Sequence, residues 1–165
     1  MVEQRLIIAM QQAQPDVTFI VAYQNNPMPA HVFCEVFAIG DTFAGLPVYT
    51  NDETTEIIST IYKYKVSLSY NGLMRSKAHE HARHIHNYLQ SFQARLALKE
   101  QGISLLRVED IVTVPILKDT DMYMKYIVDI VIASEESDSF AIDVIDVVTI
   151  HGDLETRQDD YDIGG

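Results

Sequence analysis

The spacing of hydrophobic residues changes from a strand period to a helix period in the middle of the chain. From Glu56 to Tyr70, apolar and aromatic side chains recur at every second position, and lysines and serines alternate with them in the second half. This alternation predicts a long strand with one buried face. A turn is predicted at Asn71-Gly72. Apolar residues then step by three or four from Met74 to Leu96, which predicts one helix of about 25 residues.

Shorter elements are predicted on either side. Apolar residues at helical spacing predict a short helix over residues 1–13, which Pro15 ends. Runs of β-branched and aromatic residues predict strands at 17–23, 31–39, 104–108, 111–114, 122–133 and 140–150. Polar segments predict a loop at 24–29 and turns at 119–121 and 135–138. This order predicts an α+β fold, a mainly antiparallel β-sheet packed against one long and one short α-helix.

The long predicted strand does not fit inside a compact body. Fifteen extended residues span about 50 Å, whereas a domain of this length is about 40 Å across. The early part, residues 53–61, lacks clean alternation, and with residues 32–50 as its partner it predicts a projecting β-hairpin. An isolated hairpin is marginally stable in water, so we expect it to contact another subunit. The side chains expected at this oligomer interface are Val32, Val36, Ile57, Ile58 and Ile61.

Composition limits the class of protein. The chain has 165 residues, of which 47% are hydrophobic and 22% charged, which are globular values. We expect a single domain over residues 1–151, followed by an acidic, flexible C-terminal tail at 152–165. The single cysteine, Cys34, excludes an intrachain disulfide. Neither a secretory signal nor a membrane-spanning segment is expected, so the sequence predicts a protein made in a reducing compartment.

Charge is distributed unevenly along the chain. The net charge is −12, yet residues 63–107 carry 8 basic and 2 acidic residues, whereas residues 108–165 carry 3 and 15. The overall negative charge disfavours tight binding of nucleic acid. The basic middle section has two interpretations: a solvated helix face, or a face that meets the acidic surface of a neighbouring copy.

The sequence contains no convincing catalytic or metal-binding pattern. His79, His81, His84 and His86 lie close together, but the residue four positions after His79 is Arg83, so the zinc-protease spacing fails. On a helix no three of these histidines share a face, and they are predicted to be a polar surface. There is no glycine-rich phosphate loop and no nucleophile elbow.

Two further candidates are weak. Cys34 is predicted to be a small buried side chain, and Asp143 and Asp146 would point to opposite faces of a strand. We therefore predict no catalytic residue, no metal, no cofactor and no enzymatic activity.

Two alternatives remain open at this point. The histidine-rich helix could serve a small metal-dependent hydrolase. The face of Tyr62, Tyr64 and Tyr70 could serve a binding module, although alternating tyrosines are more often sheet packing.

The order of several segments resembles the bacteriophage neck and tail terminator proteins. The segments are Tyr23-Gln24-Asn25-Asn26-Pro27-Met28-Pro29, the strand at 64–70 leading into a long helix, Gly102 to Val108, and the alternating strand at 123–132. The resemblance covers roughly residues 15–150. It rests on the order of segments, and a neighbouring head-completion or connector family of the same fold is the closest alternative.

The resemblance implies a structural protein of the virion. Such proteins form rings, typically hexameric, at the head–tail junction. The ring ends the tail tube and joins it to the head connector or adaptor protein, and DNA passes through the lumen without specific binding. The implied partners are copies of the chain itself, the connector and the tail tube protein, with no membrane. Assembly in the cytoplasm of the bacterial host is implied as well.

Overall fold

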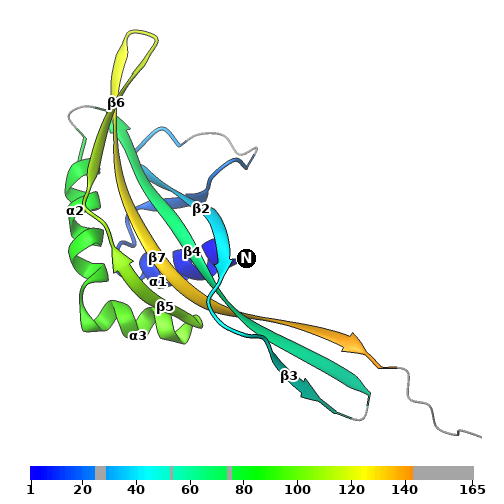
Figure 1. Ribbon diagram of the computed structural model, residues 1–165. Coiled ribbons are helices and arrows are strands. Elements are labelled where there is room, and N and C mark those ends of the chain that lie inside the picture. The colour runs from blue at the N-terminus through cyan, green and yellow to red at the C-terminus, as the bar shows by residue number, and fades with distance from the viewer. Residues whose placement is uncertain (25–28, 53, 74–75, 143–165) are drawn as a thin grey trace, which may run out of the picture.

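The protein folds as one β-sheet with three helices, which confirms the predicted α+β class. The computed structural model describes residues 1–24, 29–52, 54–73 and 76–142. The elements are α1 (Val2–Gln11), β1 (Thr18–Val21), β2 (Phe33–Phe43), β3 (Val48–Asn51), β4 (Thr55–Leu73), α2 (Ala78–Leu89), α3 (Phe92–Glu100), β5 (Ile103–Val108), β6 (Val112–Lys118) and β7 (Asp121–Ala141). Figure 1 shows their arrangement.

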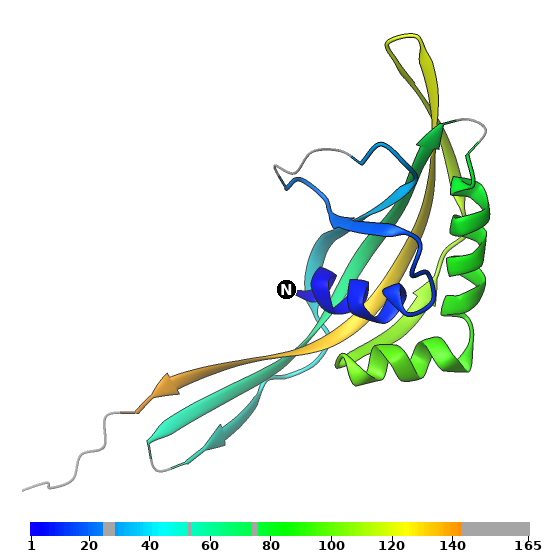
Figure 2. The ribbon, with the colours of Figure 1, turned by 180° about the vertical axis from the view of Figure 1, so that it is seen from behind.

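Two long strands form the centre of the sheet. β4 and β7 are antiparallel and pair continuously from Thr55–Ala141 to Leu73–Tyr123. The strand order is β1-β2-β4-β7-β5, with β3 also on β4 and β6 also on β7. Only β1 and β2 are parallel. Both ends of the β4–β7 pair extend past the helices, so the molecule projects in two directions (Figures 1 and 2).

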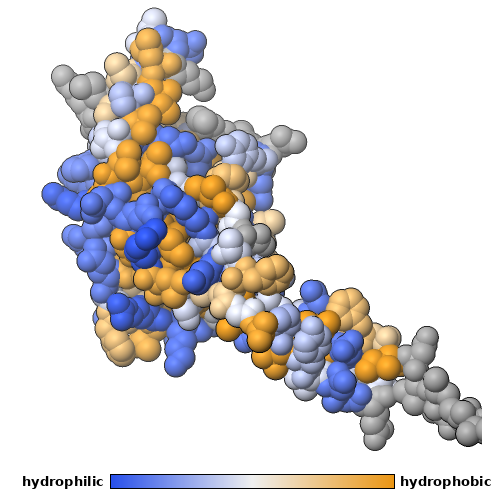
Figure 3. All heavy atoms as spheres, in the orientation of Figure 1, coloured by the Kyte–Doolittle hydropathy of each residue, from blue (hydrophilic) through white to orange (hydrophobic). Residues whose placement is uncertain are grey.

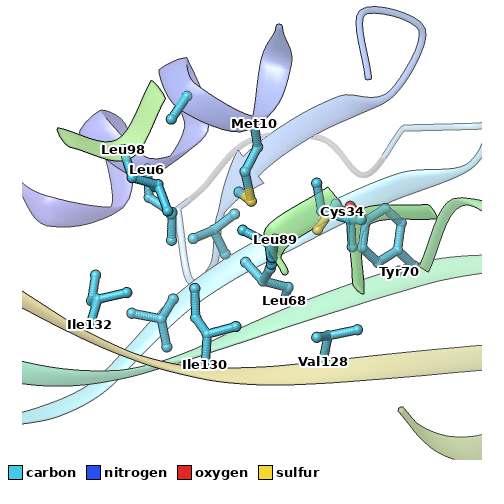
Figure 4. Packing of buried hydrophobic residues seen from close by; sticks show 14 of the residues in the cluster. Leu6, Met10, Cys34, Leu68, Tyr70, Leu89, Leu98, Val128, Ile130 and Ile132 are labelled. Carbon is cyan, nitrogen blue, oxygen red and sulfur yellow. The ribbon is translucent and has the colours of Figure 1, made fainter. Parts of the chain in front are cut away.

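The three helices share one hydrophobic core with one face of the sheet. Alternate residues of β4 and β7, such as Leu68 and Ile130, are fully buried because successive side chains of a strand point to opposite faces. They pack in one cluster with Leu6 of α1, Leu89 of α2 and Leu98 of α3 (Figure 4). Each such side chain contributes about 1.5–3 kcal/mol by its removal from water. The core therefore holds the middle of the sheet and leaves its two ends uncovered.

The opposite face of the sheet carries charged side chains. Lys65 Nζ lies 3.3 Å from Asp129 Oδ2, and Lys125 Nζ lies 3.2 Å from Glu35 Oε2. Ser67 Oγ also donates a hydrogen bond to Asp129. In these half-exposed ion pairs each charge has a partner of opposite sign on the same face. The face therefore needs no second layer of helices and can remain open to solvent.

The prediction of one long helix was wrong. Of that segment the structure describes two helices, α2 and α3, which turn sharply relative to each other between Leu89 and Phe92 (Figure 2). Ser91 starts the second helix, because its hydroxyl accepts a hydrogen bond from the Ala94 N–H at 3.2 Å. Leu89 and Leu98 are both buried in the core. The spacing of apolar residues by three or four therefore continues across the break between α2 and α3, which Ser91 creates by capping α3.

The predicted turn at 135–138 was also wrong. β7 runs through these residues without interruption as far as Ala141. Their acidic side chains are exposed because this part of the strand lies outside the core, and so the composition resembled that of a turn. The predicted strand at 140–150 overlaps the end of β7, and its residues from 143 onward, together with Asp143, Asp146 and the tail at 152–165, lie outside the described residues.

A buried polar chain links α1, β4 and α2. The Tyr70 hydroxyl donates to Gln14 Oε1 at 2.6 Å, and Gln14 Nε2 donates to the carbonyl oxygen of His81 at 2.8 Å. Both Tyr70 and Gln14 are buried. Burial raises the pKa of Tyr70 far above its ordinary value, so the hydroxyl remains a neutral donor.

We expect Tyr70→Phe to destabilise the fold by about 1–3 kcal/mol, because Gln14 Oε1 would be buried without a donor. Urea unfolding followed by circular dichroism measures this change. Tyr88→Phe is the matched control, because the Tyr88 hydroxyl has no hydrogen bond within the described residues. Equal stability of the two variants would contradict the prediction.

Candidate interaction surface

One end of the sheet projects as a three-stranded arm. We define the arm as β3, residues 55–61 of β4 and residues 135–141 of β7. In Figures 1 and 2 it extends away from the helices. The sequence predicted a two-stranded hairpin with residues 32–50. Of that segment, residues 48–50 do pair with β4 in the arm, whereas residues 33–43 of β2 pair with the middle of β4, and the end of β7 supplies a third strand that was not predicted.

The arm exposes apolar side chains on both of its faces. On one face lie Ile57 and Ile61, 37% and 47% exposed, together with Val48. On the other face Tyr49 pairs across the strands with Ile58, and Phe140 follows on β7. None of the described helices covers either face of the arm. Apolar side chains of the arm are visible at the surface in Figure 3, and exposed apolar patches of this kind commonly mark interaction sites.

The structure separates the five predicted interface residues. Ile57, Ile58 and Ile61 lie on the arm, with Ile58 half-buried. Val36 is fully buried in the core beneath the helices, and this leaves it no surface for a neighbouring subunit. Val32 is half-buried against the core at the opposite end of β4. The proposed interface is therefore reduced to the three isoleucines.

The arm is acidic. Within its described residues and the β3–β4 turn it carries five acids and no lysine, arginine or histidine. These acids are Asp52, Glu56, Glu135, Glu136 and Asp138. Asp52 closes the turn by accepting hydrogen bonds from the backbone N–H groups of Thr54 and Thr55, which lower its pKa.

Arg5 fixes the base of the arm to the body. Its guanidinium donates to Glu136 Oε1 at 2.6 Å and to Ser134 Oγ at 2.8 Å, and it reaches the Gln101 carbonyl oxygen at 3.4 Å. The Tyr64 hydroxyl donates to the same Glu136 oxygen at 3.4 Å. One side chain of α1 thus ties together the start of the arm and the end of α3.

We expect Arg5→Ala to lower the free energy of unfolding by about 1–2 kcal/mol, since it removes charge-assisted hydrogen bonds to half-exposed groups. We also expect faster amide hydrogen exchange in residues 134–138 than in the wild type, measured by mass spectrometry. Arg83→Ala, an exposed arginine with no ion pair among the described residues, is the control. Unchanged exchange at 134–138 would show that Arg5 does not hold the arm.

The opposite end of the sheet forms a second exposed region. A groove of about 550 Å³ lies beside the β6–β7 hairpin, lined by Val32, Phe33, Leu73, Ile116 and Tyr123 among others. The hairpin itself exposes further apolar side chains, including Leu117 at 70% (Figure 3). The body of the protein therefore lies between two apolar projections.

The histidines are dispersed over the surface of α2. His79 stacks near the ring of Tyr126, and His84 lies 3.3 Å from the Gln14 amide. Among the residues that the structure describes, no group of three or more histidine, cysteine or acidic side chains is placed to hold a metal ion. Nothing in this geometry supports the metal-dependent alternative.

The three tyrosines of β4 differ in their surroundings. Tyr70 is buried in the core, whereas the rings of Tyr62 and Tyr64 lie 6.3 Å apart and Tyr62 also contacts the ring of Phe43. Tyr70 therefore cannot contribute to an exposed binding face.

Within the described part of the chain, no helix has the length and hydropathy of a membrane span.

Cys34 is fully buried between the sheet and the helices, and burial raises the pKa of its thiol far above the ordinary value. A thiol of this kind is a poor nucleophile. We expect no reaction with Ellman's reagent in native protein, and one thiol per chain to react in 6 M guanidinium. Stoichiometric reaction of the folded protein would contradict this placement.

Comparison with known proteins points to one family. A family model described as phage neck terminator protein matches residues 4–156. No curated protein matches the sequence. One solved structure without a descriptive name aligns with 79% of this chain and 94% of its own chain, at 14% identity and a TM-score of 0.38. A likeness at that TM-score carries no argument about the fold.

Proposed function

Because the chain belongs to the phage neck terminator family, and is thus a structural protein of the virion, we propose that it assembles into a ring at the neck. In this ring the protein ends the tail tube and joins it to the head connector. The ring is expected to be hexameric, and DNA passes through its lumen without specific binding. The observation that carries the proposal is the three-stranded arm, whose exposed apolar side chains are covered by none of the described helices.

The arm supports assembly for an energetic reason. Its residues gain backbone hydrogen bonds from pairing but almost no burial, and a few strands without a packed face are only marginally stable. A contact with a second copy would bury Val48, Ile57 and Ile61 on one face, or Tyr49 and Phe140 on the other. Such a contact joins different surfaces of two copies and therefore closes into a ring when the rotation between them is suitable.

The charge of the chain supports the passage of DNA. A net charge of −12 keeps the protein from binding phosphates tightly. Sliding of DNA through the lumen requires such weak contact.

We expect Ile57→Thr/Ile61→Thr to raise the concentration needed for assembly about tenfold or more. Threonine keeps the β-branched shape that favours a strand, while each change loses about 1 kcal/mol or more of apolar burial at the interface. Sedimentation velocity over a concentration series, with electron microscopy of the rings, measures the shift.

The matched control is Val112→Thr/Ile116→Thr on β6, which makes equivalent changes at 56% and 39% exposed positions at the other end of the sheet. This variant is expected to assemble as the wild type does. Wild-type protein that stays monomeric at every concentration, even with the tail tube protein added, would overturn the ring.

A further inference from the structure

We propose that the arm of one protomer docks in a basic groove between α3 and β5 of the next protomer. The groove is lined by Arg95 of α3, by Leu105, Leu106, Arg107 and Val108 of β5, and by His86 of α2, among other residues. It has a volume of about 470 Å³, and we call it the β5 groove. This inference rests on the proposed ring and names the surface that receives the arm.

The β5 groove is basic, whereas the arm is acidic. Arg95 is exposed and has no ion pair among the described residues, so its charge is available to a partner. Arg107 lies 2.7 Å from Glu109 but remains 66% exposed. Leu106, which also lines the groove, is 51% exposed. Asp110 is the acid at its margin.

The arm presents the complementary pattern. Glu135 and Asp138 are exposed and have no ion pair within the described residues, whereas Glu136 is already bound to Arg5. Successive side chains of a strand point to opposite faces, so Glu135, directly opposite Ile61, lies on one face of the arm, and Asp138, directly opposite Ile58, lies on the other. An acidic arm of this kind matches a groove that carries two arginines and the exposed Leu106.

The positions of the two surfaces suit a head-to-tail contact. Helices α2 and α3 lie on the opposite side of the molecule from the arm in both ribbon views (Figures 1 and 2). β5 is also the last strand of the sheet in its order, so its outer edge has no strand partner among the described residues. Donor and acceptor surfaces that differ and lie apart form a head-to-tail contact rather than a symmetric dimer, and this contact closes into a ring when the rotation between copies is suitable.

The other grooves fit the arm less well. The groove beside the β6–β7 hairpin is lined by apolar and neutral polar residues, with His31 as its one titratable cationic side chain. The groove between α1, α2 and α3 includes Glu100, which would repel the arm, and no arginine or lysine. Of these three grooves, the β5 groove is the one that contains two arginines.

Charge reversal with rescue tests the pairing. The groove variant is Arg95→Glu and the arm variant is Glu135→Arg/Asp138→Arg. A triple variant combines all three changes. Lys77→Glu is the control, because Lys77 is exposed, has no ion pair among the described residues and lines no part of the β5 groove. Arg95 and Lys77 both lie near a helix N-terminus, where glutamate is favourable, so both single variants should fold.

Sedimentation velocity would show the groove and arm variants assembling at concentrations about tenfold or more above the wild type. The triple variant should recover at least part of this loss, and the Lys77→Glu control should match the wild type. Thermal unfolding of each variant identifies any that fail to fold, and for these Arg95→Gln and Glu135→Gln/Asp138→Asn replace the reversals.

Two results separate the inference from the proposed function. If the Arg95→Glu variant assembles into rings as readily as the wild type, or if the triple variant shows no recovery of assembly, the β5 groove is not the receiving surface. Either result would leave the proposed ring intact. A wild-type protein that forms no ring would overturn the proposed function itself.

Discussion

The pairing of β4 with β7 determines the shape of this protein. The two strands form one uninterrupted ladder over the 19 residues of β4, and every other strand except β1, which pairs with β2, attaches to one of them. Because backbone pairing does not depend on side-chain burial, the ladder continues past the point where the helices stop. The middle of the pair is thus part of the protein core, and its two ends are projections that none of the described helices covers.

The helices limit how much of the ladder can be buried. Helices α1, α2 and α3 cover Leu68, Ile130 and the neighbouring core side chains, and this packing stabilises the body of the protein. The arm has no equivalent layer, and Arg5 is the side chain that connects its base to α1. The body is therefore held by its own core, whereas the arm is available for contact with another subunit. A neck protein that assembles into a ring would need both properties.

Periodicity and residue type were sufficient to predict the class of fold, the strand at 56–70 and the membership of Leu68 and Tyr70 in the core. They were not sufficient where burial ends. Residues 135–138 were predicted to be a turn because exposed strands and turns have a similar polar composition. The helix break at Ser91 was not predicted because the helical spacing of apolar residues continues on both sides of this serine. Val36 could not be distinguished from the isoleucines of the arm, because apolar side chains look alike in sequence whether they face a helix or water. Arg5 gave no signal at all, since its partners are more than 90 residues away.

The five acids of the arm also exclude one mode of self-association. Two free strand edges of identical arms could join by ordinary backbone pairing, and such edges commonly cause aggregation. Here that approach would bring Glu135 and Asp138 of one copy against the same residues of another, and the repulsion of like charges opposes it. The acidic side chains therefore disfavour pairing between two identical arms. This repulsion directs the early association of free subunits away from symmetric dimers and fibrils.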